Sequence, residues 1–189
     1  PVRTLSRTPP VSGHNLVLNL DARLQEVAYH ALGDRRGALV AIDPATGGVL
    51  AFVSKPGFDP NLFVDGIDSL HWNELNNSPD KPLVNRALNG TYPPGSTFKP
   101  YMALAALTYG KRTPQQTIND PGYFMFGGHQ FRDSRPGGHG IVDMYKSIVK
   151  SSDTYYYMVA NDQGIYAIAR FMAQFGFGSR TGIDVSGES

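Results

Sequence analysis

Three serine–lysine pairs in the chain have a spacing at which the lysine can serve as a base for the serine hydroxyl. The pattern Ser-x-x-Lys occurs at Ser78/Lys81, Ser96/Lys99 and Ser147/Lys150. On a helix, positions three apart are neighbours on one face, so the lysine amine reaches the hydroxyl and accepts its proton as the oxygen attacks a carbonyl. Because the spacing occurs three times, it does not identify a nucleophile by itself.

The surroundings favour Ser96 as the nucleophile and Lys99 as its base. A Pro-Pro-Gly approach at 93–95 leads into an apolar segment that predicts a helix. A helix start favours developing negative charge at Ser96, and apolar neighbours bury Lys99, which must lose its proton to act as a base. The Ser78/Lys81 pair lies in a polar loop. The Ser147/Lys150 pair ends a short helix, where we expect the serine and the lysine to be solvated. The alternative for Ser96 is an ordinary N-cap with a solvated Lys99.

A second motif, Ser151-Ser152-Asp153, falls between two predicted helices. Enzymes that use a Ser-x-x-Lys nucleophile carry a second serine with a polar side chain two residues on, where the serine relays a proton to the leaving group. Here the third position is aspartate, where asparagine is commoner. We expect Ser151 and Asp153 to face a cleft. The alternative is a serine or aspartate cap on the following helix.

Two carboxylates and an imidazole form a candidate metal site. Asp120, Asp133 and His139 lie in glycine-rich loops, and such groups bind zinc. We expect the fourth ligand near the second motif, where Ser152 offers only a poor hydroxyl ligand. The alternative is turn-forming aspartates beside a surface histidine.

The remaining pattern predicts an α+β fold. A helix capped by Asp21 and ended by Gly33 precedes two β-branched strands, 38–42 and 49–53, joined by a glycine-rich turn. Further helices are expected at 97–110, 142–150, 154–163 and 165–175, whereas 55–95 and 112–140 show no sustained period.

Composition narrows the class of protein. The chain has 189 residues and no cysteine, which excludes disulfides. Its net charge is +1 and it has no run of like charges, so nothing indicates a nucleic-acid footprint. No apolar run approaches the roughly 18–20 residues that span a bilayer, so a membrane anchor would lie outside this sequence. Residues 1–15, rich in proline, serine and threonine, are expected to end a linker, and 16–189 to form one domain.

These motifs resemble the transpeptidase domain of class B penicillin-binding proteins, most of all the elongation-type penicillin-binding protein 2 of Gram-negative bacteria. The most specific string is Tyr-Pro-Pro-Gly-Ser-Thr-Phe-Lys-Pro at 92–100. The aspartate form of the second motif also fits. The other matching stretches are 37–44, 84–87, 120–122, 151–157 and 175–188.

The resemblance implies a fold, an activity and partners. The fold would be the penicillin-binding, serine β-lactamase-like one, with helices packed on an antiparallel sheet. Ser96 would attack the D-Ala-D-Ala carbonyl of a peptidoglycan stem peptide, and an amine from a neighbouring stem peptide would resolve the acyl-enzyme into a cross-link. β-Lactams would acylate the same serine. The chemistry requires no cofactor. The family works at the periplasmic face of the inner membrane beside a membrane glycosyltransferase and rod-complex proteins.

One family element is missing from the sequence. The third motif, Lys-Thr/Ser-Gly, lies on a strand in the family, whereas Arg180-Thr181-Gly182 comes too soon after the second motif and matches a segment upstream of the true one. We therefore expect 16–189 to be the N-terminal portion of the domain, and this segment alone to acylate weakly or not at all. Two other classes remain open: a serine β-lactamase-like hydrolase, told apart by penicillin turnover, and a penicillin-binding sensor that is acylated without turnover.

Overall fold

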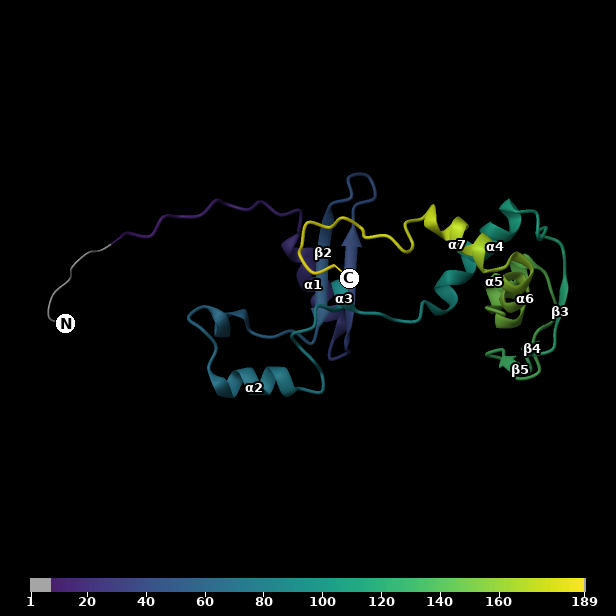
Figure 1. Ribbon diagram of the computed structural model, residues 1–189, viewed down its shortest axis with the longest axis horizontal. Helices are drawn as coiled ribbons and strands as arrows, with labels where there is room; N and C mark the ends of the chain where they lie inside the picture. The colour runs from purple at the N-terminus through teal and green to yellow at the C-terminus, as the bar shows by residue number, and fades with distance from the viewer. Residues whose placement is uncertain (1–7, 189) are drawn as a thin grey trace. The chain divides into compact units, whose positions relative to one another are not determined.

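The computed structural model describes residues 8–188, which fall into two compact units divided between Thr91 and Tyr92 (Figure 1). None of the helices formed by the described residues has both the length and the apolar character needed to cross a bilayer.

The first unit is built on one helix and one hairpin. Helix α1 (Ala22–Leu32) is capped by Asp21 and is followed by the antiparallel pair β1 (Gly37–Ile42) and β2 (Val49–Lys55). These elements confirm the predicted helix and hairpin. Three buried residues form the centre of the packing: Ala28, Ala51 and Val53.

The residues before α1 form no helix or strand between 8 and 21. The predicted linker at 1–15 falls partly in this stretch, and its first seven residues lie outside the described ones. The linker boundary stays a prediction.

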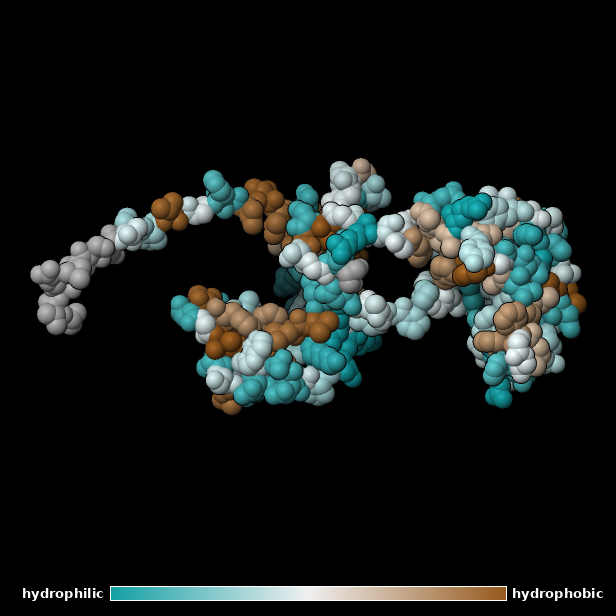
Figure 2. Space-filling model, in the orientation of Figure 1, coloured by the Kyte–Doolittle hydropathy of each residue, from teal (hydrophilic) through white to brown (hydrophobic). Residues whose placement is uncertain are grey.

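The segment predicted to be irregular at 55–95 contains helices. They are the 3-10 turn η1 (Pro60–Phe63), α2 (Ser69–Asn77) and α3 (Arg86–Asn89). Helix α2 has no buried residue, so no apolar period marks it in the sequence, and it is started by the Asp68 cap. Apolar side chains are visible on the surface of the segment that holds α2 (Figure 2). Val64, Leu70 and Trp72 of this segment are exposed.

The second unit is a helical body with two small antiparallel strand pairs. Its helices are the 3-10 turn η2 (Gly95–Phe98), α4 (Lys99–Thr108), α5 (Met144–Lys150), α6 (Asp153–Gln163) and α7 (Ile165–Ala173). The four predicted helices are present. The buried cluster of this unit has eleven residues, contributed mainly by α4, α6 and α7, with fully buried Tyr155 and Val159 among them.

The stretch predicted as loop at 112–140 forms two short antiparallel pairs. Strand β3 (Ile118–Asp120) pairs with β6 (Gly140–Val142), and β4 (Tyr123–Phe126) pairs with β5 (His129–Arg132). The strands have only three or four residues, too few for a period to show in the sequence. The α+β class is confirmed.

A close backbone approach fixes the loops between these strands. A Cβ atom on Gly138 would lie 2.2 Å from the carbonyl oxygen of Asp120, so no other residue fits there without displacing the backbone. This approach draws the residues after β5 towards β3, and with them the side chains that follow.

Candidate active site

Ser96 lies at the entrance to α4. It sits in η2, and the α-helix itself begins at Lys99, two residues later than predicted, with Pro100 in its first turn. Ser96 is exposed. A proline lead-in and a positive φ of 57° at Gly95 produce this tight entry, which leaves the hydroxyl open to a substrate.

Ser151 ends helix α5 in the left-handed conformation, with φ 56° and ψ 40°. This conformation is uncommon for a residue other than glycine and indicates that the surrounding contacts hold it. From here the Ser151 hydroxyl donates a hydrogen bond of 2.8 Å to Ser96 Oγ. The second motif therefore contacts the first directly.

The ammonium group of Lys99 makes three short contacts with the second motif. Nζ lies 2.6 Å from the Ser151 carbonyl oxygen, 3.0 Å from Ser151 Oγ and 2.6 Å from Asp153 Oδ1. Lys99 is 8% exposed, so the alternative of a solvated lysine is wrong. Lys99 Nζ also lies 5.9 Å from the centroid of the Tyr156 ring, within cation–π range.

Ser96, Ser151 and Lys99 thus form one hydrogen-bonded chain. An ammonium has three protons to donate, and all three are engaged here. Ser151 Oγ stands between the lysine and the Ser96 hydroxyl, so a proton can pass between Ser96 and Lys99 through it. The arrangement fits acyl transfer, in which a serine oxygen must lose a proton and a leaving nitrogen must gain one.

The middle residue of the second motif has a different task. Ser152 is fully buried, and its Oγ accepts a hydrogen bond of 3.1 Å from the peptide N–H of Tyr155, which makes it the N-cap of α6. The capping alternative is therefore correct for Ser152, while Ser151 and Asp153 are free to hold Lys99.

The expectation of a solvated Ser147 is wrong. Ser147 is fully buried, and its Oγ donates to the Met144 carbonyl at 2.7 Å and lies 3.0 Å from the hydroxyl of Tyr156. Burial raises the pKa of Tyr156 to about 12.

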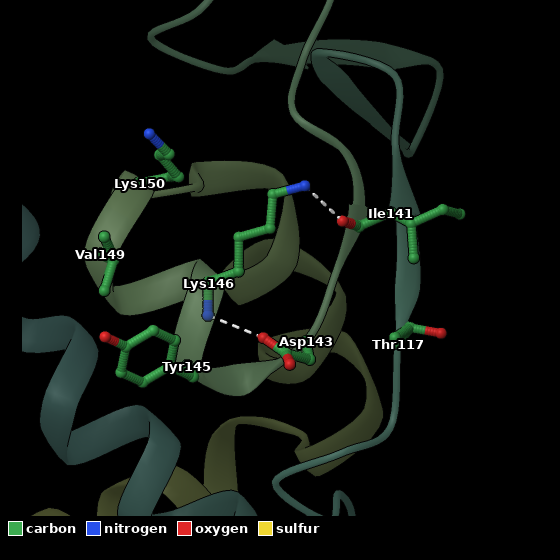
Figure 3. A pocket seen from close by; sticks show the side chains of 7 residues that line it. All are labelled: Thr117, Ile141, Asp143, Tyr145, Lys146, Val149 and Lys150. Atoms are coloured by element: carbon green, nitrogen blue, oxygen red, sulfur yellow. Dashed lines mark hydrogen bonds between the residues drawn. The ribbon is translucent and has the colours of Figure 1, made fainter.

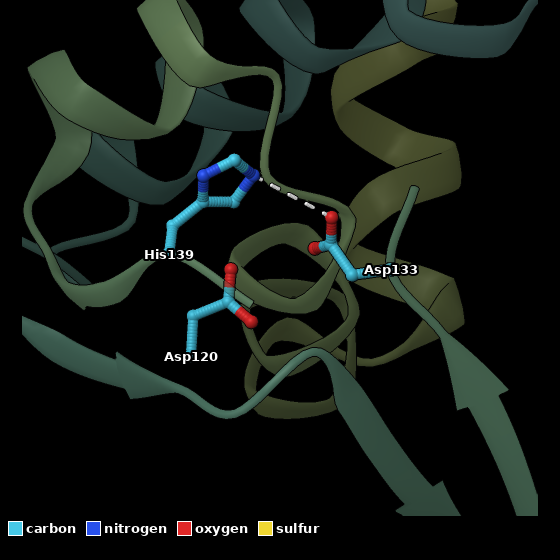
Figure 4. A group of neighbouring side chains, drawn as sticks. All are labelled: Asp120, Asp133 and His139. Carbon is cyan, nitrogen blue, oxygen red and sulfur yellow. Dashed lines mark ion pairs between the residues drawn. The ribbon is translucent and has the colours of Figure 1, made fainter. Parts of the chain in front are cut away.

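Asp120, Asp133 and His139 come together as predicted (Figure 4). One ligand atom from each lies within 4.8 Å of the others, and the His139 side chain is only 6% exposed, so the surface-histidine alternative is wrong. His139 Nε2 lies 3.6 Å from Asp133 Oδ1, and neither ring nitrogen has a hydrogen-bond partner among the described residues. Ser152 Oγ donates to Asp120 Oδ2 at 2.8 Å.

The charge state of Asp133 is set by opposing causes. Burial by itself raises the pKa of this carboxyl group, but hydrogen bonds donated by the peptide N–H groups of Thr154 and Arg135 together outweigh it and lower the pKa below its ordinary value. Asp133 is therefore an anion at neutral pH, as a metal ligand must be.

A surface pocket of about 440 Å³ lies elsewhere on this unit, beside α5 and β6 (Figure 3). Its lining includes none of Ser96, Lys99, Ser151 and Asp153. The Lys146 ammonium in the lining donates to the carbonyl oxygens of His139 and Ile141. The whole lining is Thr117, Ile141, Asp143, Tyr145, Lys146, Val149 and Lys150. The pocket is therefore separate from the Ser96 site.

Comparison with known proteins gives consistent matches. A family model described as the penicillin-binding protein transpeptidase domain matches residues 37–189. Peptidoglycan D,D-transpeptidase MrdA of Acinetobacter baumannii is 51% identical over 190 residues, which cover 100% of this chain and 28% of that protein. MrdA of Escherichia coli K12 is 47% identical over 189 residues, 99% of this chain and 30% of that protein. The chain spans less than a third of these relatives.

Comparison with solved structures also gives matches to penicillin-binding proteins. Pseudomonas aeruginosa PBP2 in complex with WCK 5153 superposes with a TM-score of 0.87 at 48% identity, covering 95% of this chain and 41% of that one. Helicobacter pylori PBP2 in complex with MreC gives 0.84 at 36% identity, covering 90% and 32%. The penicillin G acyl-enzyme of Mycobacterium tuberculosis penicillin-binding protein A gives 0.76 at 29% identity, covering 86% and 40%.

Proposed function

Because the chain belongs to the penicillin-binding protein transpeptidase domain family, we propose that the native protein containing it is a peptidoglycan D,D-transpeptidase that cross-links stem peptides through an acyl-enzyme on Ser96. The observation that carries the proposal is the chain of hydrogen bonds from Ser96 through Ser151 to the buried Lys99. Asp153 completes the contacts of the ammonium.

In this proposal each residue has its own step. For attack, Lys99 must be the neutral amine, and it takes the Ser96 proton through Ser151 as Ser96 Oγ bonds to the D-Ala-D-Ala carbonyl carbon. The same proton then returns through Ser151 to the nitrogen of the departing D-alanine as the peptide bond breaks. An incoming amine reverses these steps, gives up its proton and restores Ser96. The peptide N–H of Ser96 would supply one donor to the oxyanion.

The same serine would be the target of β-lactams, whose carbonyl it would attack in the same way. Two family relatives support the partner proposals: a penicillin G acyl-enzyme has been solved for one, and a complex with MreC for another. We propose that the native protein works at the periplasmic face of the inner membrane with rod-complex proteins and a membrane glycosyltransferase.

Labelling by fluorescent penicillin tests this function in the native protein. We expect one adduct per chain on Ser96, and cross-linked product from stem-peptide substrates. Absence of the adduct, or an adduct that persists in Ser96→Ala, contradicts the assignment of the nucleophile. Rapid release of hydrolysed penicillin would indicate a hydrolase, and acylation without any cross-linked product would indicate a sensor.

We further propose that Asp120, Asp133 and His139 hold a structural zinc ion, independent of the acyl transfer, which needs no cofactor. The support is chemical: two carboxylates and an imidazole are zinc ligands, and a buried imidazole without hydrogen-bond partners is costly unless a ligand satisfies it. Ser152 offers a hydroxyl beside Asp120, and water would complete the coordination.

Metal analysis of the purified native protein tests the zinc proposal. His139→Gln is the informative variant because it removes an imidazole that makes no hydrogen bond. His129→Gln, on the exposed strand β5, is the matched control. We expect one zinc per chain in the parent and in His129→Gln and none in His139→Gln; zinc-free parent protein after growth in zinc would overturn the proposal.

A further inference from the structure

The carboxylate of Asp153 is held at both oxygens. Oδ1 lies 2.6 Å from the Lys99 ammonium, and Oδ2 accepts a hydrogen bond of 3.1 Å from the peptide N–H of Ser134. Ser134 is in the turn that directly follows β5. A two-point hold fixes the rotation of a carboxylate, whereas a single contact leaves it free to turn.

The turn is bound to α6 by a second hydrogen bond in the opposite direction. Asp133 Oδ2 accepts from the peptide N–H of Thr154 at 2.8 Å, one of the first-turn donors of α6 that lacks a partner within the helix. Asp133 Oδ1 also accepts from the peptide N–H of Arg135 at 3.2 Å. The turn and the first residues of α6 are therefore joined by two hydrogen bonds, one between Asp133 and Thr154 and one between Ser134 and Asp153.

Contacts outside the site also hold the 133–135 turn in place. The peptide N–H of Asp133 donates to the Gly122 carbonyl at 2.9 Å, and the β4–β5 hairpin packs on α6 through Phe131, whose ring centroid lies 5.8 Å from that of Tyr157. A Cβ on Gly122 would lie 2.6 Å from the peptide nitrogen of Gly138. The peptide N–H of Ser134 therefore belongs to a segment of backbone that neighbouring contacts hold in place.

We propose that the turn 133–135 is a positioning element for Lys99: the peptide N–H of Ser134 orients Asp153, and Asp153 in turn orients the lysine. This inference rests on the proposed roles of Ser96 and Lys99. Asp153 touches the proposed base, whereas Ser134 acts only through Asp153. Loss of the Ser134 donor frees the carboxylate to rotate, and Lys99 is then aligned with Ser151 for a smaller share of the time.

Two substitutions at one position separate the backbone donor from the side chain. Ser134→Pro removes the N–H, and Ser134→Ala keeps it. In the native protein we expect the acylation rate constant for a fluorescent penicillin to fall roughly ten- to a hundredfold in Ser134→Pro, the cost of a lost hydrogen bond to a charged group. The dissociation constant of the non-covalent complex should stay the same, and Ser134→Ala should stay within about threefold of the parent. Equal rates in all three proteins, or equal losses in both variants, overturn the proposal.

Amide hydrogen exchange tests the same contact without catalysis and without the proline variant. Asp153→Ala should speed exchange of the Ser134 amide at least roughly tenfold. The Arg135 amide, which donates to Asp133, is the internal control and should keep its protection. Unchanged exchange at Ser134 overturns the inference even if Ser96 is acylated. If instead Ser96 is not acylated while Ser134 loses protection, the contact stands and the proposed function fails.

Discussion

The segments that carry Ser96/Lys99 and Ser147/Lys150 have the same spacing and belong to the same unit, yet their environments are opposite. Ser96 is exposed and its lysine is buried, whereas Ser147 is fully buried and Lys150 is exposed. Ser96 Oγ accepts from Ser151, and Ser147 Oγ is occupied by the Met144 carbonyl and the Tyr156 hydroxyl. Spacing brings a hydroxyl and an amine near each other, but burial decides which of the two groups is available.

The two segments are joined by one side chain. The hydroxyl of Tyr156 contacts Ser147, and its ring lies 5.9 Å from the Lys99 ammonium. The buried serine therefore supports the ring that lies beside the proposed base. The comparison assigns chemistry to the first pair and support to the second, and each assignment fails or holds under a matched substitution.

The largest expected difference is in acylation. In the native protein, Ser96→Ala should lower the rate of covalent labelling by penicillin by about 10³-fold or more, because the attacking oxygen is gone. Ser147→Ala should label at a rate within roughly tenfold of the parent, since it removes only a supporting hydrogen bond. Mass spectrometry of the adduct gives both values. Loss of labelling in a folded Ser147→Ala protein would break the comparison.

The lysines should differ next. Lys99→Ala removes the proposed base, a loss of roughly 10²–10⁴-fold in acylation for general base catalysis. Lys150→Ala alters an exposed residue and should leave the rate within about twofold. Stopped-flow labelling across both variants measures the contrast. If Lys99→Ala retains the parent rate, the base lies elsewhere.

These contrasts also show how far the sequence could lead. The Pro-Pro-Gly approach and the apolar helix correctly separated the buried Lys99 from the exposed Lys150. Ser147 was expected to be solvated and is instead buried by contacts with another helix that local composition does not report. The catalytic assignment of Ser96, Lys99, Ser151 and Asp153 stays a prediction until acylation is measured. The hydrogen bond from the peptide N–H of Ser134 to Asp153 could not be predicted from the sequence, because every residue except proline carries a peptide N–H.

The elements of the fold likewise divide into those that a local sequence pattern predicts and those that it does not. Helices with a buried face, such as α7, were found, and α2 was missed because it buries nothing. Strands β3 to β6 are too short for a period and are held by contacts between residues distant in sequence, such as Gly138 against Asp120. Such contacts depend on tertiary packing that a local pattern does not contain.

For the free energy of unfolding, we expect Ser147→Ala to have a larger effect than Ser96→Ala, the reverse of the order expected for acylation. Ser147→Ala leaves the Tyr156 hydroxyl without its buried partner and should lower the free energy of unfolding by about 1–3 kcal/mol. Ser96→Ala changes an exposed hydroxyl and should stay within about 0.5 kcal/mol of the parent. Urea unfolding at pH 7 measures both. A larger loss in Ser96→Ala than in Ser147→Ala would contradict the assigned roles.

The smallest effect is a pH dependence at Tyr156, where the two segments meet. Its pKa is raised to about 12 by burial, whereas an unfolded tyrosine ionises near pH ~10. The unfolded chain therefore loses this proton first as the pH rises, and the stability that the neutral phenol contributes is complete below about pH 10 and is lost towards pH ~12. At pH 11 the loss should be about 1.4 kcal/mol. Tyr156→Phe has no proton to lose, so urea unfolding at pH 8 and pH 11 should show a smaller drop in this variant than in the parent by that amount. Equal drops would mean that the hydroxyl is open to solvent, and Ser147 would then support nothing beside Lys99.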